Sequence, residues 1–464
     1  MAYSNSRGTT PIPEPGSHSS SSFQAPGPTA QLSRPYTIKK RSSTQSKVRL
    51  LRVVFCYKKK DASWRLIKLK IHRIRSSFSR RLPETVDAVD ASLLIVDHTT
   101  LPGGAELALT HFAGVSKLNA TFAFLQENDG RLAFPRRTVV LAPDRSLGAI
   151  QQLHFLRTVL RRHKRSLIVS NTLRAGVYVV LLKGRRQEHV LLLHDGIDGQ
   201  SLSPLKRAIL NWLVLSRTKA IVPNSRWTAS TVPEKFQGLL TTVAYTFSGT
   251  TGNEHRGRVE RADARPLRLL SLSRLVKWKG VHLVLDALEI LAKENFGERD
   301  LILTIAGSAI LGPDKYAAEL KSRAKLLPFS VEFVGQVAQI APLLLSNDVL
   351  VHASVRPEPF GQVIVQGLSY GLVVVAPDSG GPAEILNDES GLLFTRGSSI
   401  SLANALRHLL ESPELRKSLV ENGQAAAISY SDSEIVKKYD TIFRSVLGFP
   451  EVLQEESKIS DGVA

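Results

Sequence analysis

The sequence has almost no cysteine, since Cys56 is the only one among 464 residues. A single thiol excludes an internal disulfide and a cysteine-rich metal site, and it is typical of a reducing compartment. The chain also lacks any apolar run near the roughly 20 residues that a membrane span needs. Its first residues, Met1 to Arg7, lack the apolar core of a signal peptide. We therefore expect a cytoplasmic protein.

Positive charge is present in excess and is unevenly distributed. The chain has 61 Lys and Arg against 41 Asp and Glu, a formal net charge of +20. Residues 1–90 hold 18 of the cations and 5 of the acids, so an excess of 13 lies there, and the rest of the chain carries the remaining 7. We expect this basic stretch to meet an anionic neighbour, either a membrane surface or nucleic acid.

The composition divides that stretch into two parts. Residues 1–45 are rich in Ser, Pro, Gly and Thr, which predicts a disordered N-terminal arm. Residues 46–90 form a basic segment with large apolar side chains at helical spacing, namely Trp64, Ile67, Ile71, Ile74 and Phe78. Such an amphipathic helix can lie at an anionic bilayer surface, or it can pack on a folded body with its basic face solvated.

Beyond residue 90, short apolar strands alternate with helix-like segments. The first predicted strand is Ser92–Asp97, and the alternation restarts at Leu267 after a polar stretch. Strands separated by helices predict βαβ units and parallel sheets. We therefore predict an α/β fold with Rossmann-like domains at 91–249 and 267–430. A linker at 250–266 joins them, and a loose tail follows at 448–464.

The most informative stretch begins with the predicted buried strand Val349–Ala353. Arg356 and Glu358 lie in the loop after it, a predicted helix ends at Gly371, and the next strand opens into Gly380-Gly381. In open α/β sheets ligands bind where strands end and helices begin, because helix N-termini attract anions. An acid in one loop and a glycine pair in the next suit a ligand with both hydroxyls and phosphates.

This block resembles the donor site of the family-four retaining glycosyltransferases, the glycosyl transferases group 1 with the GT-B fold. The resemblance rests on Glu358-Pro-Phe-Gly361, the apolar helix, Gly371, Val374 and Gly380-Gly381. It implies two doubly wound domains facing a central cleft, with 91–249 binding the acceptor and 267–430 the nucleotide-sugar donor. A helix at 431–447 would cross back to the first domain. The implied reaction moves a sugar from the nucleotide to a hydroxyl with retention of the anomeric configuration.

The resemblance also implies catalytic roles for four residues. Arg274 and Lys279 lie five apart across a strand-to-helix loop, so both can point at one diphosphate. The family uses such a pair to neutralise the leaving nucleoside diphosphate. Glu358 would hold hydroxyls of the donor sugar, and His194, at a strand exit, would lie near that sugar. Two cations in a loop and a lone histidine are also common structural features, so that alternative stays open.

Ten further positions are predicted to bind substrate. They are Gly103, Gly104, Gly335, Phe360, Gly361, Gln362, Val363, Gln366, Gly380 and Gly381. The family has a glutamate where this chain has Gln366. Glutamine keeps one acceptor and adds donors, so we expect weaker binding of the donor ribose. Two fixed cations remove the need for a divalent metal, and no cofactor is expected.

The predicted partners are a nucleotide sugar and a glycan or lipid-linked acceptor, as in cell-envelope or exopolysaccharide synthesis. The basic N-terminal segment adds the hypothesis of peripheral contact with an anionic membrane at its inner face. Two alternatives remain. The absent glutamate allows a catalytically silent GT-B scaffold, and the basic arm allows a nucleic-acid-binding protein.

Overall fold

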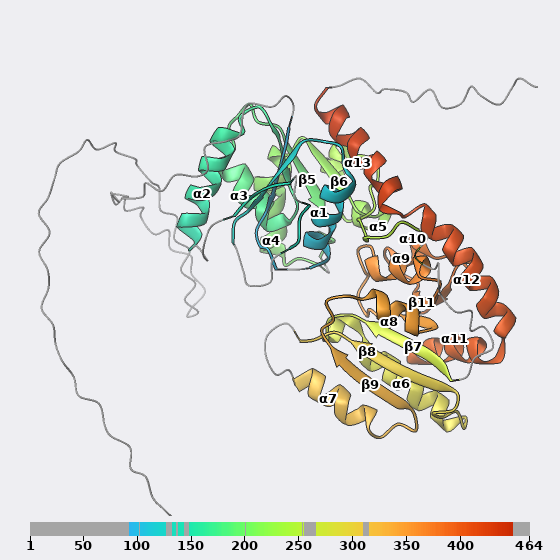
Figure 1. The fold of residues 1–464 in the computed structure, drawn as a ribbon. Helices are drawn as coiled ribbons and strands as arrows, with labels where there is room; N and C mark the ends of the chain where they lie inside the picture. The colour runs from blue at the N-terminus through green and yellow to red at the C-terminus, as the bar shows by residue number, and fades with distance from the viewer. Residues whose placement is uncertain are drawn as a thin grey trace, which may run out of the picture. The chain divides into compact units, whose positions relative to one another are not determined.

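The computed structural model describes residues 92–448, apart from residue 102, 127–131, 136–137, 143–147, 200, 253, 255–265 and 310–314. The predicted disordered arm, the basic segment with its helix, and most of the predicted linker lie outside the described residues. The same holds for the predicted tail after residue 448. The described chain forms two parallel six-stranded sheets (Figure 1).

The first sheet has the strand order β3-β2-β1-β4-β5-β6. Its strands are β1 (Leu93–Asp97), β2 (Ala120–Phe124), β3 (Val139–Leu141), β4 (Leu167–Ser170), β5 (His189–Leu193) and β6 (Ala220–Pro223). Every residue of β1, β4 and β5 is buried, as expected for parallel strands covered on both faces. The direction in which successive strands are added reverses between β1 and β4, and this switch point is where open α/β sheets bind ligands.

Helices cover both faces of this sheet. On one face lie α1 (Gly104–Val115) and the last helix of the chain, α13 (Asp432–Val446). Phe112 of α1 contacts Tyr439 and Phe443 of α13 with ring centroids 6.1 and 6.2 Å apart, so the end of the chain packs on the beginning of the fold. On the other face lie α2 (Ala149–Arg162) and α3 (Leu173–Leu182).

The helical segment before β6 changes its winding along its length. It begins as α4 (Pro204–Ile209), continues as a π-helical stretch over Leu210–Val214 and ends as a 3-10 turn over Leu215–Arg217. A short helix, α5 (Arg226–Ser230), and a 3-10 helix over Glu234–Leu239 follow β6.

The second sheet has the strand order β12-β11-β10-β7-β8-β9, which repeats the winding of the first. Its strands are β7 (Leu267–Leu272), β8 (Leu301–Ala306), β9 (Ser330–Gly335), β10 (Val349–Val351), β11 (Val373–Pro377) and β12 (Leu392–Phe394). The switch point of this sheet lies between β7 and β10. The loops that leave these two strands carry Arg274, Lys279 and Glu358.

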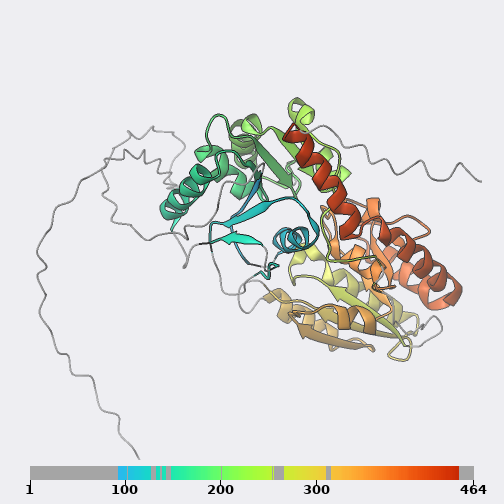
Figure 2. The same cartoon turned by 45° about the horizontal axis from the view of Figure 1, so that its top comes forward.

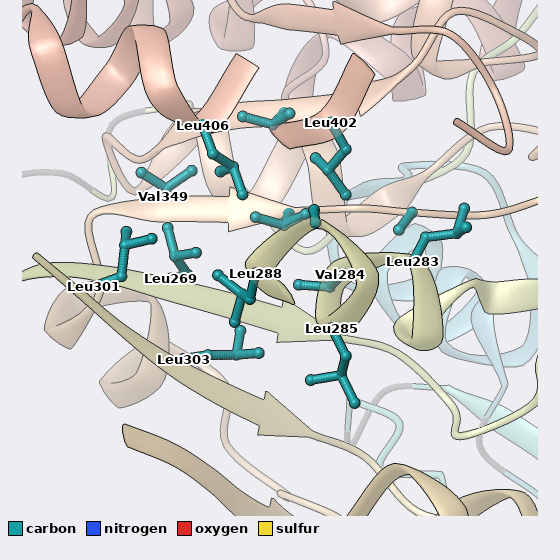
Figure 3. Packing of buried hydrophobic residues seen from close by; sticks show 14 of the residues in the cluster. Leu269, Leu283, Val284, Leu285, Leu288, Leu301, Leu303, Val349, Leu402 and Leu406 are labelled. Carbon is teal, nitrogen blue, oxygen red and sulfur yellow. The ribbon is translucent and has the colours of Figure 1, made fainter. Parts of the chain in front are cut away.

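Helices also cover both faces of the second sheet (Figure 2). One face carries α6 (Val281–Lys293), α7 (Lys315–Ala324) and α11 (Ser399–Glu411). The other carries α8 (Ala341–Ser346) and α9 (Gln362–Ser369), with α10 (Pro382–Ile385) and α12 (Pro413–Ile428) beside them. In Figure 3 the buried Leu288 of α6 packs against Leu269 and Leu303 of the sheet.

One predicted strand is shorter in the structure. Strand β10 ends at Val351, two residues before the predicted Ala353, and the Ala353 carbonyl oxygen lies against Gly280. In the described ranges, no helix combines the length and the apolar character that crossing a bilayer requires.

Candidate functional site

A buried ion pair lies at the switch point of the second sheet. Lys279 Nζ donates to Glu358 Oε2 at 2.6 Å, and the two side chains are only 12% and 13% exposed. Ser354 Oγ donates to the same oxygen at 2.9 Å, and His352 Nε2 lies 3.3 Å from it without hydrogen-bond alignment. Three polar groups from the β7 and β10 exits therefore surround one carboxylate oxygen.

Gly280 allows these two exits to approach each other. It has φ +70, and a Cβ at this position would lie 1.8 Å from the Ala353 carbonyl oxygen. Only glycine meets both conditions without strain. The position of Lys279 beside Glu358 thus follows from the glycine that comes after it.

Electrostatics keep Glu358 ionised. Burial alone would raise its pKa, but the Lys279 ammonium and then His352 hold the pKa of this carboxyl well below its usual range. Arg274 adds a second cation, because its guanidinium lies 5.5 Å from the Trp278 ring centroid and Lys279 Nζ lies 4.3 Å from the same centroid. The arrangement presents two cations around one indole, next to a charged carboxylate that can accept hydrogen bonds from hydroxyls.

The glycine pair after β11 supports the Glu358 loop. Gly381 N donates to the Glu358 carbonyl oxygen at 2.8 Å, and Gly380 has φ +75. A Cβ at Gly380 would lie 2.3 Å from the Glu358 carbonyl oxygen, and one at Gly381 would lie 2.3 Å from that of Phe360. Close packing of two loops therefore accounts for both glycines, and it positions Glu358.

A second polar cluster lies at the switch point of the first sheet. Asn171, at the exit of β4, donates from Nδ2 to Asp97 Oδ2 at 2.6 Å and to the Ala105 carbonyl oxygen at 3.0 Å. Its Oδ1 must then be the acceptor toward His194 Nε2, at 2.9 Å. Asp97 thus orients the Asn171 amide, and the amide selects the His194 tautomer that carries its proton on Nε2.

His194 is neutral and faces the interior of the first sheet's layer. Burial lowers its pKa to about 4. Its Nδ1 is buried and accepts no hydrogen bond from the described residues. The ring borders a small cavity whose other walls include Phe112, Phe247 and Tyr439. The structure therefore places His194 in the Asp97–Asn171 cluster, and among the described residues no hydrogen bond or ion pair joins it to Glu358.

Sequence reasoning passed over Asp195, the neighbour of His194. This carboxyl is exposed to solvent, yet dense surrounding protein and then the Glu358 charge raise its pKa, while Arg274 and Lys279 lower it. The pKa of Asp195, which follows a strand of the first sheet, is therefore shifted by three charges of the second half, those of Glu358, Arg274 and Lys279. The position of Asp195 at a strand exit could have indicated a functional acid, but the resemblance implied a role for the adjacent His194 instead.

Two glutamines of α9 contact the end of the first half of the chain. Gln362 Nε2 donates to the carbonyl oxygens of Gly104, at 3.0 Å, and Phe247, at 2.6 Å. Gln366, one turn later, donates from Nε2 to the Ser248 carbonyl oxygen at 2.7 Å. Two of the predicted binding residues, Gly104 and Gln362, are thus brought together, and Gln366 uses its amide as a donor to backbone.

The other predicted binding positions differ in whether they are buried or face open space. Phe360 is buried and stacks on Tyr245 with ring centroids 5.5 Å apart, and Val363 packs against the same apolar cluster. Gly361, with φ +101, begins α9. Gly335, with φ +73, has open space where a Cβ would point, and Gly103 directly precedes α1. Side-chain contact with a ligand is therefore open to Gln362 and Gln366 but not to the Phe360 ring.

One group of side chains has the spacing of a metal site. Single ligand atoms of Asp97, His98 and Glu106 lie within 4.8 Å of one another. Both Asp97 oxygens are already used, by His98 Nδ1 at 3.0 Å and by Asn171. Burial and then Asp97 raise the pKa of Glu106 to about 7, so its carboxyl holds a proton readily. These features suit a hydrogen-bonded cluster better than a cation site.

Two parallel sheets with the same doubly wound order define the GT-B fold. Solved structures agree with it. The structure of Anabaena Alr3699/HepE in complex with UDP and glucose covers 77% of this chain and 99% of its own, with a TM-score of 0.63 and 25% identity. Sucrose-phosphate synthase from Thermosynechococcus elongatus covers 77% and 99%, with a TM-score of 0.61 and 16% identity, which shows the fold alone.

A family model matches the second half of the chain. Residues 254–426 match the model of the glycosyl transferases group 1, which confirms the predicted resemblance. The phosphatidyl-myo-inositol mannosyltransferase of Mycobacterium leprae is 33% identical over 174 residues, which are 36% of this chain and 44% of the relative. The lipopolysaccharide core biosynthesis glycosyltransferase LpsE of Rhizobium meliloti is 27% identical over 195 residues, 41% and 53% respectively. The chain thus spans about half the length of these curated relatives.

Proposed function

We propose that this protein is a retaining glycosyltransferase, which moves a sugar from a nucleotide-sugar donor to a hydroxyl of a glycan or lipid-linked acceptor. The observation that carries the proposal is the Lys279–Glu358 pair with Arg274 beside it, at the switch point of the second sheet. The family match over residues 254–426 supports the same reaction class. Relatives named for glycolipid and lipopolysaccharide synthesis support a role in cell-envelope glycans.

The charges suit the chemistry of this transfer. As the bond from the anomeric carbon to the diphosphate breaks, negative charge grows on the leaving oxygen, and Arg274 and Lys279 can stabilise it without a metal. Glu358, ionised at neutral pH, accepts hydrogen bonds from hydroxyls of the donor sugar. The acceptor hydroxyl forms the new bond on the same face and must release its proton. Asp195, with its raised pKa, is a candidate to take that proton.

The donor is expected to be a uridine or other nucleoside diphosphate sugar. A related solved structure is described as a complex with UDP and glucose, which supports this class of ligand. The Gln366 amide already donates a hydrogen bond to the Ser248 carbonyl oxygen, so it does not offer a free side chain to the donor ribose. We expect Gln366 to influence donor affinity through the position of α9 rather than as a charged partner of the ribose.

The test is transfer and hydrolysis with a panel of nucleotide sugars, using wild type, Lys279→Ala, Arg274→Ala and Lys277→Ala. Lys277 lies in the same loop, is exposed and does not contact Glu358, so it is the matched control. Losing either site cation should lower kcat/KM by about 100-fold or more, and losing Lys277 by about threefold at most. The anomeric configuration of the product is read by NMR.

The outcomes separate the competing functions. Unchanged turnover in Lys279→Ala would contradict the proposed site, and an inverted product would contradict retention. Thermal stabilisation by a nucleotide without turnover of any donor would favour the silent scaffold. Salt-dependent binding of duplex DNA by the full chain, in the absence of any nucleotide-sugar effect, would favour the nucleic-acid alternative.

A further inference from the structure

The edge of the first sheet opposite the candidate site carries a dense group of cations. Strands β4, β5 and β6 are parallel neighbours, with Ile168 paired to His189 and Val190 to Ala220. Their amino-terminal ends therefore meet at one edge, and the loops that enter them lie side by side. The Asp97–Asn171 cluster and Asp195 lie at the carboxyl ends of strands of this sheet, roughly 15 Å away along the strands.

Each of the three connections that enter these strands, including the last turn of the helix before it, contributes exposed Lys or Arg. Four precede β4, namely Arg161, Arg162, Lys164 and Arg165. Two precede β5, Arg185 and Arg186, and two precede β6, Arg217 and Lys219. We call these eight residues the basic edge. In the part of the chain that the structure describes, the one ion pair among them joins Lys219 to Glu188 at 3.9 Å.

The loops of the basic edge are joined to each other. Gln187 Nε2, in the loop before β5, donates to the Leu160 and His163 carbonyl oxygens at the end of α2, at 3.0 and 3.1 Å. Lys219 N, before β6, donates to the His189 carbonyl oxygen at 2.7 Å. These hydrogen bonds hold the three backbone segments that carry the cations against one another.

The sequence contains this concentration as well. Residues 149–220 hold 13 Lys and Arg against 3 Asp and Glu, an excess of 10. Residues 91–464 together carry an excess of 7, so the rest of that range is net negative. The positive excess of residues 91–464 thus comes from residues 149–220, which contain the whole basic edge, and a count over the full range conceals it.

Large apolar side chains are exposed on the helices that lead into the basic edge. Trp212 is 74% exposed, and the Arg217 guanidinium lies 5.6 Å from its ring centroid. Leu181, 54% exposed, lies in the last turn of α3, shortly before Arg185. Leu205 and Ile209 of α4, 68% and 45% exposed, precede Trp212 of the π-helical stretch at helical spacing. Water solvates such a stripe poorly, and an apolar phase would cover it favourably.

We propose that the basic edge, with Trp212 and Leu181, docks the protein on the surface of an anionic phospholipid bilayer. The cations would lie among the headgroup phosphates, and the tryptophan and leucines would reach the boundary of the acyl chains. A nucleic acid would satisfy the cations but offers no apolar phase for Leu181, Leu205 and Ile209. The basic edge consists of other residues than the basic N-terminal segment 46–90, and the proposal does not depend on the proposed reaction.

The test uses the full chain and flotation with vesicles of two parts phosphatidylcholine to one part phosphatidylglycerol, compared with pure phosphatidylcholine. The edge variant is Arg161→Gln, Arg162→Gln, Arg185→Gln and Arg186→Gln together. The matched control removes four exposed cations of the second half, Lys293, Arg299, Lys325 and Lys417, also to Gln. Both variants keep the N-terminal arm and have the same net charge, so a difference between them belongs to the basic edge.

We expect the edge variant to bind the anionic vesicles at least about tenfold more weakly than the control variant. Trp212→Ala should weaken vesicle binding about threefold or more while leaving any duplex binding unchanged. On the wild type, vesicles should slow hydrogen exchange in 161–165 and 183–187. Equal binding by the edge and control variants, or no slowing in these loops, would overturn the proposal. Equal losses of vesicle and duplex binding in Trp212→Ala would overturn the assignment to a bilayer.

Discussion

At the scale of single residues, the surroundings of two carboxyls, Glu358 and Glu106, shift their pKa values in opposite directions. Glu358 is surrounded by polar partners, so its pKa is held low. Glu106 is buried near Asp97 with little compensation, so its pKa rises to about 7. Because a pKa shift on folding is also a dependence of stability on pH, each group should leave its own signature in the unfolding of the protein.

Glu358→Gln should remove a stabilising term that is present above the ordinary pKa of 4.5 and is lost as the pH falls through the lower folded value. It leaves Lys279 as a buried cation without its partner, so we expect a loss of about 3 kcal/mol at pH 7. The difference from wild type should shrink in acid. Urea unfolding at pH 7 and pH 3 measures this, with the exposed Glu389→Gln as control. A constant difference across that range would contradict the shift of Glu358.

Glu106→Gln should act in the opposite sense. A raised pKa means that the folded protein binds a proton between pH 4.5 and about 7 that the unfolded chain has released, so this group makes wild-type stability fall as the pH rises through that window. The glutamine has no such dependence. We expect the variant to be more stable than wild type at pH 8 by roughly 1–3 kcal/mol, and the gain to vanish near pH 4.5. Destabilisation at pH 8 would show that the carboxylate is needed there.

At the scale of elements, glycines decide how closely the site loops approach each other. Gly280 and Gly380 both have positive φ, and both have a carbonyl oxygen where a Cβ would point. Gly280 allows the β7 exit to pack against the chain at Ala353, and Gly380 allows the β11 exit to pack against the Glu358 loop. The binding geometry of Lys279 and Glu358 therefore depends on backbone contacts as much as on the charges.

Gly280→Ala should be far more damaging than Gly397→Ala. Both glycines have positive φ, +70 and +80, so both substitutions carry the same backbone strain of about 1 kcal/mol. Only at Gly280 does the new Cβ meet a carbonyl oxygen, whereas Gly397 faces open space. We expect Gly280→Ala to lower Tm by at least about 5 °C more than Gly397→Ala. Similar losses in the two variants would mean that the loop has room to shift.

At the scale of the whole molecule, the two halves of the described chain are joined by polar contacts from α9 and α10. Gln362 and Gln366 hold the Phe247 and Ser248 carbonyls, and Glu384 accepts from the Arg226 and Trp227 amides at 2.8 and 2.7 Å. The last helix adds an apolar contact through Phe443 against Phe112. These contacts position Asp195 near the charges of the second sheet.

Gln366→Glu should weaken this junction, because a carboxylate cannot donate to the Ser248 carbonyl oxygen and is repelled by it. We expect a loss of about 1–2 kcal/mol, and amide exchange at Ser248 and Gly249 that is roughly tenfold faster. The control is Gln237→Glu, an exposed position with the same change of charge. Tighter donor binding with unchanged stability would instead assign Gln366 to the ribose, as the family pattern suggests.

Much of the architecture could be predicted, because strands and helices follow from local patterns of apolar residues. Apolar runs such as Leu93–Val96 and Val373–Ala376 read as buried strands, and the structure has them in parallel sheets. The loops that carry Arg274, Lys279 and Glu358 could be expected to meet, since the strand ends of a parallel sheet lie at one edge. The burial of the Phe360 ring could not be predicted from the sequence, because it stacks on Tyr245, a residue that is distant in the sequence.

The amino-acid sequence by itself determined the two sheets, the resemblance of residues 254–426 to the glycosyl transferases group 1 and the loops that hold the site charges, because strand runs, turn glycines and strand-exit residues are short-range signals. Only the tertiary structure decided which groups face each other. It engaged the Gln366 amide with a carbonyl, placed His194 in the Asp97–Asn171 cluster, and gathered the cations of three separate loops at one edge. Such contacts depend on strand order and side-chain direction, and neither is encoded within a short window of sequence.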